Sequence, residues 1–542
     1  MPPPTRAQQA LTETIPAAVA ASIAARTDAE AVVEPGRRVT YGELGGLVGS
    51  STRAMIAAGV GPGDRVAIWA PNGLGWIVAA LGAQSAGAAL VPINTRFKGE
   101  EAAYVLSASK AELLVTTVGF LDTDTVGMLG AIETPLPHLR RIVLLEGSAD
   151  AAAAPKDTDV EPWHAFAGRA EGISVATAEE RRQSVQPTDT SDVLFTSGTT
   201  GRPKGVVMTH GQTVRQFREW CDFAGLQPGD RYLIVNPFFH MFGYKAGWLA
   251  SLLQGATIVP VPVFDVPEVL SRVETERITV FPGAPTIYRS ILDHPGLDAF
   301  DLHTLRVAVT GAADIPVALI EEMRARLPFQ RILTGYGLTE AGTCTGTRPD
   351  DDAETIAKTA GRAMRDLEIV VAGANGQEAP RGTPGELLVR GYSVMQGYLD
   401  DPQATSAAID DRGFLHTGDL ATMDDRGYVR IVGRLKDMII VGGFNVYPAE
   451  VENALLAHEA IGQVAVIGVP DPRMGEVAIA YVVSAPGRSA DPDAIIGWAR
   501  ERLANYKVPR HVVVVSELPT NATGKILKQE LRARAPSDLG DG

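Results

Sequence analysis

The sequence has little cysteine, little lysine and no excess of positive charge. Its 542 residues include two cysteines, Cys221 and Cys344, which are too few for a disulfide framework or a cysteine-rich metal site. The formal net charge is −15, whereas a nucleic-acid groove needs a basic surface. These absences predict a protein of a reducing compartment, the cytoplasm, with no nucleic-acid partner. They leave a local nucleotide site open, and because there are only ten lysines, each one in a motif is informative.

The sequence also lacks a long unbroken apolar run. Residues 66–95 carry no charge, but prolines and glycines divide them into an expected strand at 66–70, a helix at 74–87 and a strand at 89–93. The apolar stretch at 15–25 follows a glutamate and little positive charge, which favours an amphipathic opening helix over a signal peptide. The sequence therefore predicts no integral membrane segment.

Short apolar runs alternate with helix-like windows from about residue 60 to residue 335. Alternation of this kind requires crossover connections, so it predicts an α/β fold in which helices flank largely parallel sheets. The segment 147–180 is rich in alanine and acidic residues and is expected to be a surface excursion. Further strands are expected at 193–196, 231–235, 257–261, 305–310 and 331–334, and helices at 211–224, 243–253 and 316–327.

The pattern changes after about residue 360. Short strands separated by turn clusters, expected at 367–372, 386–390 and 428–432, indicate a small antiparallel barrel. A compact α+β piece follows, with strands at 438–441, 464–469 and 476–483 and helices at 449–457 and 493–503. We expect a large N-terminal domain at 1–433 that includes the barrel, a hinge at 434–436, and a small mobile C-terminal domain at 437–542.

The most informative motif is TSGTTGRPKG at residues 196–205. It follows an expected strand, precedes a helical pattern, and holds three glycines and four hydroxyl residues. Backbone amides and short hydroxyl donors can wrap an anion, and Lys204 adds positive charge. A flexible surface loop is the alternative, and the spacing of an ordinary nucleoside-triphosphatase P-loop is absent. The motif therefore predicts a phosphate-binding loop.

This motif resembles the phosphate loop of the adenylate-forming (ANL) superfamily, which includes acyl-CoA synthetases, nonribosomal-peptide adenylation domains and firefly luciferases. Further motifs follow in the usual order of the family, so the resemblance covers nearly the whole chain. The sequence is most similar to FadD-type acyl-CoA synthetases, in particular actinobacterial ligases for fatty acids or sterol remnants. The resemblance implies a carboxylic-acid substrate, with ATP, Mg²⁺ and coenzyme A as cofactors.

The resemblance assigns roles in nucleotide binding to three segments of the N-terminal part. The loop contributes Thr196, Ser197, Gly198, Thr199, Thr200, Gly201 and Lys204, and the next segment places Gly311, Ala312 and Ala313 beside the adenine. The motif YGLTE places Tyr336 and Gly337 near the adenine, Thr339 on the α-phosphate and Glu340 on the metal. Glu340 and Thr196 are the expected Mg²⁺ ligands, and oxygen donors of this kind suit a hard cation.

The C-terminal motifs resemble the parts of the family that move. Asp419, in TGD, and Arg434 would hold the ribose hydroxyls, and Lys436 falls at the hinge of the family. Gly442 and Gly443, in GGFNVYP, would line the pantetheine tunnel, where glycines permit close backbone approach.

The expected catalytic residues are Lys525, Glu340, His240 and Thr196. Lys525, in PTNATGK, matches the mobile lysine that grips the substrate carboxylate and the α-phosphate as charge shifts in the transition state. His240, in PFFHMFGYK, matches an aromatic-rich segment that lies beside the carboxylate and gates access for the thiol. A purely structural histidine is the alternative at that position.

The reaction implied by the resemblance has two halves. The carboxylate attacks the α-phosphate of ATP to give an acyl adenylate and pyrophosphate, and the thiol of coenzyme A then displaces AMP after the small domain turns about Lys436. An acyl-AMP ligase that serves a carrier protein, an oxidative reaction of the luciferase kind and a nucleotide sensor with a degenerate site remain alternatives. An amino acid is disfavoured as substrate, because residues 239–241 offer no aspartate to pair its amino group.

The acid is expected to be hydrophobic and of medium or bulky shape. Residues 239–248, 283–287 and 337–345 should line its pocket, because they mix aromatic side chains with glycines. We expect the ammonium of Lys245 to reach solvent, with contact to a polar group of the substrate as the alternative. NPFFHMFGYKAG and TGAADIP are most similar to the subgroup that acts on the bicyclic propanoate left from sterol degradation. The exact acid stays open, and a homodimer is one assembly open to the chain.

Overall fold

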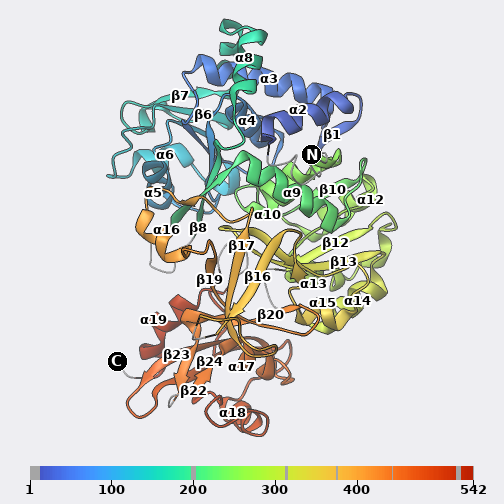
Figure 1. Ribbon diagram of the computed structural model, residues 1–542, viewed down its shortest axis with the longest axis vertical. Helices are drawn as coiled ribbons and strands as arrows, with labels where there is room; N and C mark the ends of the chain where they lie inside the picture. The colour runs from blue at the N-terminus through green and yellow to red at the C-terminus, as the bar shows by residue number, and fades with distance from the viewer. Residues whose placement is uncertain are drawn as a thin grey trace. The chain divides into compact units, whose positions relative to one another are not determined.

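The chain divides into two compact units in the computed structural model (Figure 1). The structure describes residues 12–196, 203–311, 315–373, 376–441, 444–520 and 526–540. The first unit extends to Glu368 and takes in Arg390–Leu415, and the second consists of Ile369–Val389 and the residues from His416 onward. Residues 416–434 thus belong with the C-terminal part. The hinge at 434–436 stays a prediction.

An eight-stranded sheet forms one half of the first unit, with strand order β18-β9-β8-β4-β3-β5-β6-β7. The pairs from β8 to β7 are parallel, and the pairs β8/β9 and β9/β18 are antiparallel. The prediction of a parallel-rich α/β fold is therefore confirmed. The strands are β3 (Arg65–Trp69), β4 (Ala89–Pro92), β5 (Leu113–Thr117), β6 (Arg141–Glu146), β7 (Asp159–Pro162), β8 (Thr190–Thr196), β9 (Lys204–Thr209) and β18 (Gly397–Tyr398).

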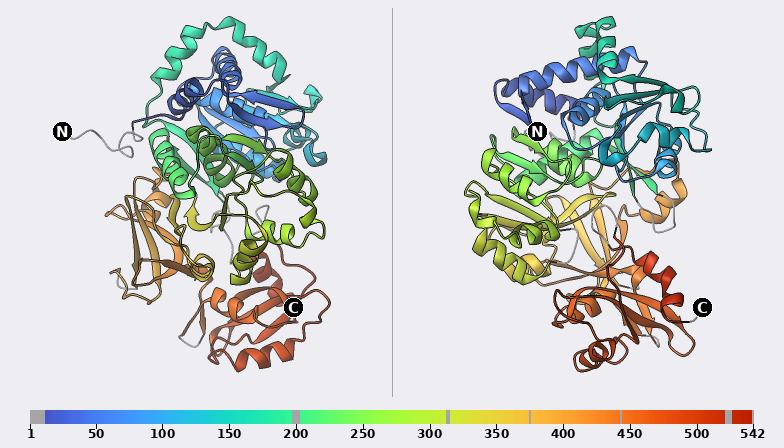
Figure 2. Two further views of the ribbon diagram at one scale, coloured as in Figure 1. Left: turned by 90° about the vertical axis from the view of Figure 1, so that its right-hand side faces the viewer. Right: turned by 180° about the vertical axis from the view of Figure 1, so that it is seen from behind.

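Helices flank the strands of the first unit (Figures 1 and 2). Helix α4 (Leu74–Ser85) has every residue but Gly75 buried, because it lies between β3 and β4 on one side and α2 (Ile15–Ala25) and α3 (Tyr41–Ala57) on the other. This burial explains the charge-free sequence around it. Among the residues that the structure describes, no helix is long and apolar enough to cross a membrane. Further helices of this half are α5 (Gly99–Ser109), α6 (Thr125–Gly130), α7 (Trp163–Gly168), α8 (Val175–Ser184) and α9 (His210–Ala224).

The other half of the first unit contains two four-stranded ladders. Isolated β-bridges formed by Val280 join the two ladders. The first has the order β10 (Arg231–Ile234), β11 (Thr257–Pro260), β1 (Glu30–Glu34) and β2 (Arg37–Thr40). The second has the order β12 (Val307–Gly311), β13 (Arg331–Leu338), β14 (Gly342–Gly346) and β15 (Arg362–Ala363). The associated helices are α12 (Val266–Thr275), α13 (Pro285–Leu292), α14 (Val317–Arg326) and α15 (Ala353–Lys358).

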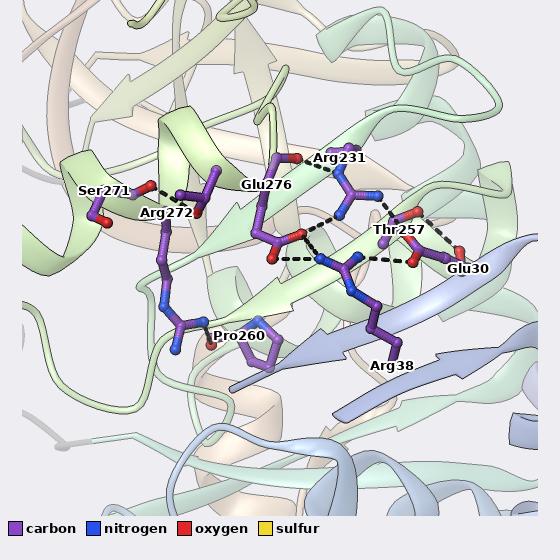
Figure 3. A network of polar contacts seen from close by, with 9 residues as sticks. Glu30, Arg38, Arg231, Thr257, Pro260, Ser271, Arg272 and Glu276 are labelled. Atoms are coloured by element: carbon purple, nitrogen blue, oxygen red, sulfur yellow. Dashed lines mark hydrogen bonds and ion pairs between the residues drawn. The ribbon is translucent and has the colours of Figure 1, made fainter. Parts of the chain in front are cut away.

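A network of ion pairs fastens the N-terminal hairpin to this half of the unit (Figure 3). Arg231 donates to Glu30 and to Glu276, each at 2.7 Å, and Arg38 donates to the same two carboxylates at 2.8 and 2.7 Å. Burial by itself would raise the pKa of Glu30, but the hydrogen bonds from Arg231 and Arg38 outweigh it and lower that pKa. The hairpin is thereby held to Arg231 of β10 and to Glu276, the residue that follows α12.

The second unit contains two further sheets. The segment predicted as a small barrel is a four-stranded sheet of order β16 (Leu367–Ala372), β17 (Gly385–Gly391), β19 (Leu415–Met423) and β20 (Val429–Arg434). The C-terminal sheet consists of β21 (Ile439–Val441), β22 (Phe444–Val446), β23 (Ile461–Asp471), β24 (Gly475–Ser484) and β25 (His511–Val514). It packs with α17 (Pro448–Leu455), α18 (Pro492–Arg500) and α19 (Lys528–Asp538) around an aliphatic core.

Three expectations about local structure were wrong. The segment 147–180 is not only a surface excursion, because it supplies the edge strand β7. The loop that begins at Thr196 is followed by strand β9 before the helix, and this six-residue strand is too short to give a periodic signal of its own. The helix expected at 243–253 is divided into α10 (Met241–Gly243), a π-helix, η4 (Tyr244–Leu249), and α11 (Ala250–Gln254).

Candidate active site

The base of the predicted phosphate loop is formed by two antiparallel strands. Thr196 ends β8, Lys204 begins β9, and the two residues are register partners, so the ladder brings the two ends of the loop together. The Tyr104 hydroxyl donates to the Pro203 carbonyl at 2.9 Å, and its ring meets the edge of Phe195 at 6.4 Å. These contacts fix where the loop leaves and rejoins the sheet. The loop residues Ser197, Gly198, Thr199, Thr200 and Gly201 lie outside the described residues.

Tyr398 connects the loop lysine to the carboxylate of the YGLTE motif. The Lys204 ammonium lies 5.0 Å from the centre of the Tyr398 ring, and the Tyr398 hydroxyl donates to Glu340 Oε1 at 3.0 Å. Burial and the neighbouring Glu340 raise the pKa of Tyr398, so its phenol remains a hydrogen-bond donor. A cation and a carboxylate are thus held near one aromatic ring without neutralising each other in a direct ion pair.

Sequence analysis missed Tyr398. It lies on the two-residue strand β18, which pairs with Val206 and Val207 of β9. The backbone amide of Met395 also donates to the Glu340 carbonyl at 2.8 Å, so the β18 segment holds Glu340 through both main chain and side chain. A single tyrosine in a short strand carries no periodic signal, and only its tertiary contacts reveal its place in the site.

The predicted adenine segment lies where β12, β13 and β14 meet. Gly311 ends β12 beside Gly335 of β13, and a Cβ atom at Gly311 would come within 3.1 Å of the Gly335 carbonyl. Gly337 is exposed, but a Cβ atom there would meet the Gly342 carbonyl at 2.4 Å, so packing between β13 and β14 already requires glycine. Tyr336 belongs to β13, Thr339 and Glu340 follow that strand, and all three are half-buried. Ala312 and Ala313 lie outside the described residues.

His240 caps the helical segment that follows β10. Its side chain is exposed, yet protein atoms surround the ring closely enough that desolvation lowers the pKa of the imidazole. The ring is therefore neutral near pH 7. Its Nδ1 accepts a hydrogen bond from the Phe242 amide at 3.2 Å, which leaves the proton of the neutral ring on Nε2. The Nε2–H of His240 is thus left as a hydrogen-bond donor.

Lys245 does not reach solvent, contrary to the expectation from sequence. Its side chain is 1% exposed, and its ammonium lies 2.8 Å from Asp192 Oδ1. The expected pocket lining at 239–248 was wrong for its second half as well. Tyr244 and Trp248 are fully buried, because they stack on each other at 5.0 Å and pack with Trp76 in the core. The accessible part of the segment is residues 239–242.

The two predicted ribose contacts are paired within the second unit. Asp419, 3% exposed, lies on β19, and its Oδ1 is 2.5 Å from Nε of Arg434 on β20. The Asp419 amide donates to the Thr417 hydroxyl at 3.0 Å, and this hydroxyl donates to the Leu387 carbonyl at 2.7 Å. The pairing orients the Asp419 carboxylate, which suits it to accept from paired hydroxyl groups.

Four other predicted residues belong to the C-terminal part of the chain. Lys436 lies in a short 3₁₀ turn at Leu435–Asp437. Gly442, Gly443 and Lys525 lie outside the described residues. The tunnel and the mobile lysine therefore stay predictions.

The donor set of the first unit fits Mg²⁺. Within the described residues there is no group of three or more histidine, cysteine, aspartate or glutamate side chains that could enclose a metal ion. Mg²⁺ does not need one, since it is commonly held by one or two carboxylates together with substrate phosphates and water. The half-buried carboxylate of Glu340 and the hydroxyl of Thr196 at the loop base are oxygen donors of the right kind.

The lysine and the carboxylate that Tyr398 connects at the loop base are groups that can bind phosphate oxygens and a metal ion, as the resemblance to adenylate-forming enzymes predicts. Comparison with known proteins agrees, because residues 19–399 match the family described as AMP-binding enzyme and residues 450–525 match the AMP-binding enzyme C-terminal domain. The chain belongs to the AMP-binding enzyme family. The prediction of an acid:CoA ligase is confirmed at the level of the enzyme class.

Similar proteins include two bacterial ligases and one solved structure. The 7a-methyl-1,5-dioxo-octahydro-1H-inden-4-yl-propanoyl:CoA ligase of Rhodococcus jostii (strain RHA1) is 49% identical, over 93% of this chain and 95% of that protein. The ligase of the same name from Mycobacterium tuberculosis (strain H37Rv) is 47% identical, over 96% of this chain and 98% of that protein. ATP-bound MatB from Rhodopseudomonas palustris has a TM-score of 0.84 at 29% identity, over 97% of this chain and all of that one.

Proposed function

We propose that the enzyme joins coenzyme A to a bulky, largely apolar fused-ring propanoate in an AMP-forming reaction. The observation that carries the adenylation half is the convergence of Lys204, Tyr398 and Glu340 at the base of the phosphate loop. It places a positive charge for phosphate oxygens close to a carboxylate for a metal ion. The choice of acid rests on the two propanoyl:CoA ligases that are 47% and 49% identical to this chain.

In the first half-reaction, a carboxylate oxygen of the acid bonds to the α-phosphorus of ATP, and the bond from that phosphorus to the bridging oxygen of pyrophosphate breaks. Lys204 offsets charge on the phosphates, and the Nε2–H of His240 orients the attacking carboxylate. Glu340 and Thr196 are the residues that would hold Mg²⁺, which supplies charge neutralisation on the phosphates when bound. Lys525 is the proposed second cation at the α-phosphate.

In the second half-reaction, the thiolate sulfur of coenzyme A bonds to the acyl carbon, and AMP leaves with the electron pair of the broken carbon–oxygen bond. We assign Asp419 and Arg434 to the ribose, Lys436 to the pivot between the half-reactions, and Gly442 and Gly443 to the thiol channel. Arg434 holds the Asp419 carboxylate in place, and its oxygens can accept hydrogen bonds from ribose hydroxyl groups.

The accessible segment around His240 suits an apolar acid. Phe239, Met241 and Phe242 are partly exposed and flank the histidine, whereas the charged Lys245 is turned into the core. An apolar surface beside one N–H donor can hold a carboxylate that carries a fused-ring body. We place the reaction in sterol degradation and in the cytoplasm, where ATP and coenzyme A are supplied. The assembly that we propose to examine is a homodimer. Transfer to a carrier protein is not favoured, since the relatives named above are CoA ligases.

The test is ATP–pyrophosphate exchange with three acids, namely a methyl-hexahydroindanedione propanoate, a straight-chain acid of similar carbon number and ferulate. Coenzyme A is then added and the thioester is detected by mass. We expect exchange and thioester with the fused-ring acid, and at least about tenfold lower kcat/KM with the other two, the discrimination that about 1.4 kcal/mol provides. Exchange with none of the acids would refute adenylation of this substrate class, and exchange without thioester would refute coenzyme A as the acceptor.

A matched pair of variants tests the site. Lys204→Met should abolish exchange because it removes the loop cation, whereas Lys110→Met, which breaks only the exposed ion pair with Asp400 at 2.9 Å, should leave it unchanged. Equal activity of the two variants would contradict the assignment of Lys204.

A further inference from the structure

A buried ion pair joins the segment that carries His240 to the strand that carries the phosphate loop. Lys245 lies in the π-helix and Asp192 lies on β8, four positions before Thr196. Their charged atoms are 2.8 Å apart, and the two side chains are 1% and 0% exposed. Because both side chains are shielded from water, solvent does not screen their attraction, and the two charged groups are held close together.

Further hydrogen bonds connect the residues of the ion pair and their neighbours to each other and to helices α4 and α9. The Ser191 hydroxyl donates to Asp192 Oδ2 at 2.7 Å, and the Lys245 ammonium donates to the Thr213 hydroxyl of α9 at 3.3 Å. Gln84 of α4 donates both to the Tyr244 hydroxyl at 2.8 Å and to the Ser191 carbonyl at 3.0 Å. Two consecutive residues of the π-helix are thus tied to two consecutive residues of β8.

Stability alone does not explain why charges occupy this place. The desolvation of two buried ions often cancels their attraction, and apolar residues of similar volume commonly serve as well or better. The neighbouring residue Tyr244 packs against Trp248 and Trp76, so an aromatic core borders the pair and its hydroxyl partners. A specific buried pair can instead select one register of an element over its alternatives. A π-helix has such an alternative, since an ordinary α-helical turn would displace the residues that precede it.

The register of the π-helix reaches His240 through the main chain. The His240 carbonyl accepts from the amides of Gly243 at 3.0 Å and Tyr244 at 2.9 Å, so His240 sits directly on the first turn. The next residue of that turn is Lys245, and its ion pair with Asp192 holds the turn against β8. A shift of the turn would therefore move the imidazole relative to Thr196.

We propose that Lys245 and Asp192 are positioning residues that set the distance between the acid-binding segment at His240 and the phosphate loop. Neither touches the acid or ATP, and both act through the backbone of the elements that carry them. This inference rests on the proposed function of that site, in which His240 orients the carboxylate for attack at the α-phosphorus. A misplacement of about 1 Å between reacting groups can cost roughly 100-fold in rate.

The test compares Lys245→Met, Asp192→Asn and the double variant Lys245→Met/Asp192→Val. The single variants leave one charge buried alone and should lower the melting temperature, whereas the double variant removes both charges and should melt close to wild type. All three should lower kcat/KM for the acid by about tenfold or more, with KM for ATP changed by less than about twofold. A double variant with wild-type melting and wild-type kcat/KM for the acid would overturn the proposal.

A matched control separates positioning from general stability. Asp230→Asn weakens another shielded ion pair, Arg306 with Asp230 at 2.5 Å. Within the described part of the chain, these two side chains hydrogen-bond to residues 225, 227 and 279 and not to the π-helix or β8. It should lower the melting temperature without changing kcat/KM for the acid. A fall in kcat/KM equal to that of the Lys245 variants would assign the effect to lost stability and overturn the proposal.

Hydrogen–deuterium exchange makes the outcome independent of the substrate. In peptides that cover residues 237–249, backbone amides should exchange hydrogen for deuterium faster in the double variant than in wild type. In Asp230→Asn, the deuterium exchange of these peptides should be unchanged. If no acid supports ATP–pyrophosphate exchange in wild type, the proposed function fails. The deuterium exchange of the peptides still decides whether the Lys245–Asp192 pair holds residues 237–249 in place. Unchanged exchange of this peptide in the double variant would overturn the positioning role on its own.

Discussion

The stability of the first unit should depend on pH through one buried histidine. His210, the first residue of α9, is 1% exposed, and its Nδ1 accepts from the Ile15 amide at 3.4 Å. Burial, followed by the positive charge of Lys245, lowers the pKa of His210 to about 3. The folded chain therefore keeps this ring neutral at pH values where the unfolded chain protonates it.

The sign and size follow from proton linkage. The unfolded state binds the extra proton, so the stability is complete above the unfolded pKa of about 6.5 and is lost as the pH falls from there toward 3. For a folded pKa of about 3, the free energy of unfolding should be roughly 1 kcal/mol lower at pH 5.5 than at pH 7.5 from this residue alone. Because the group is fully buried, solvent screening does not reduce this figure appreciably.

Urea unfolding at the two pH values measures the effect, followed by tryptophan fluorescence. Five of the six tryptophans, at positions 69, 76, 163, 220 and 248, lie in the first unit, so the signal reports mainly on it. His210→Asn removes the titration and offers Oδ1 as the acceptor for Ile15. The pH-induced loss should be smaller in this variant by roughly 1 kcal/mol.

The control is His138→Asn at an exposed histidine, which should leave the wild-type pH dependence unchanged. If His210→Asn loses as much stability as wild type between pH 7.5 and pH 5.5, then His210 is not held neutral by the fold and the linkage argument is wrong.

Three further predictions concern named contacts. Tyr398→Phe removes the 3.0 Å donor to Glu340 and should lower kcat/KM for ATP about tenfold in pyrophosphate exchange, with the fold unchanged by circular dichroism; full activity would contradict its role. Asp419→Asn leaves the Arg434 side chain without its anionic partner and should raise KM for ATP by about tenfold or more, while an unchanged KM would exclude Asp419 from nucleotide binding. Arg231→Met breaks both 2.7 Å ion pairs of the network in Figure 3 and should cost about 1–2 kcal/mol in urea unfolding, a loss that 1 M salt should reduce; no loss at low salt would show that the network contributes nothing.

Much of the first unit could be predicted from the sequence because its signals are local. Helix α4 and strands β3 and β4 were expected from one charge-free stretch broken by proline and glycine, and the structure places them within two residues of the expected bounds. The strand that leads into the TSGTTGRPKG motif was expected from its apolar run, and β8 ends at Thr196 as expected. Composition and the positions of proline and glycine are enough to predict such elements, because the residues that form them are adjacent in the chain.

Other features depend on residues far apart in the chain. Strand β18 was missed because it has only two residues and its partner β9 lies nearly two hundred positions earlier. Tyr398 was missed for the same reason, since its importance lies in contacts to Lys204 and Glu340 rather than in any local pattern.

The sequence by itself determined the enzyme class and the order of the motifs, because TSGTTGRPKG, YGLTE and TGD each resemble the motifs of one family within a few adjacent residues. The tertiary structure alone decided the fate of Lys245. A lysine in an exposed helix reaches water, whereas this one meets a buried aspartate on β8 and remains in the core. The physical reason is that a charge is buried only when a partner compensates for its lost hydration, and chain folding, not local sequence, supplies that partner.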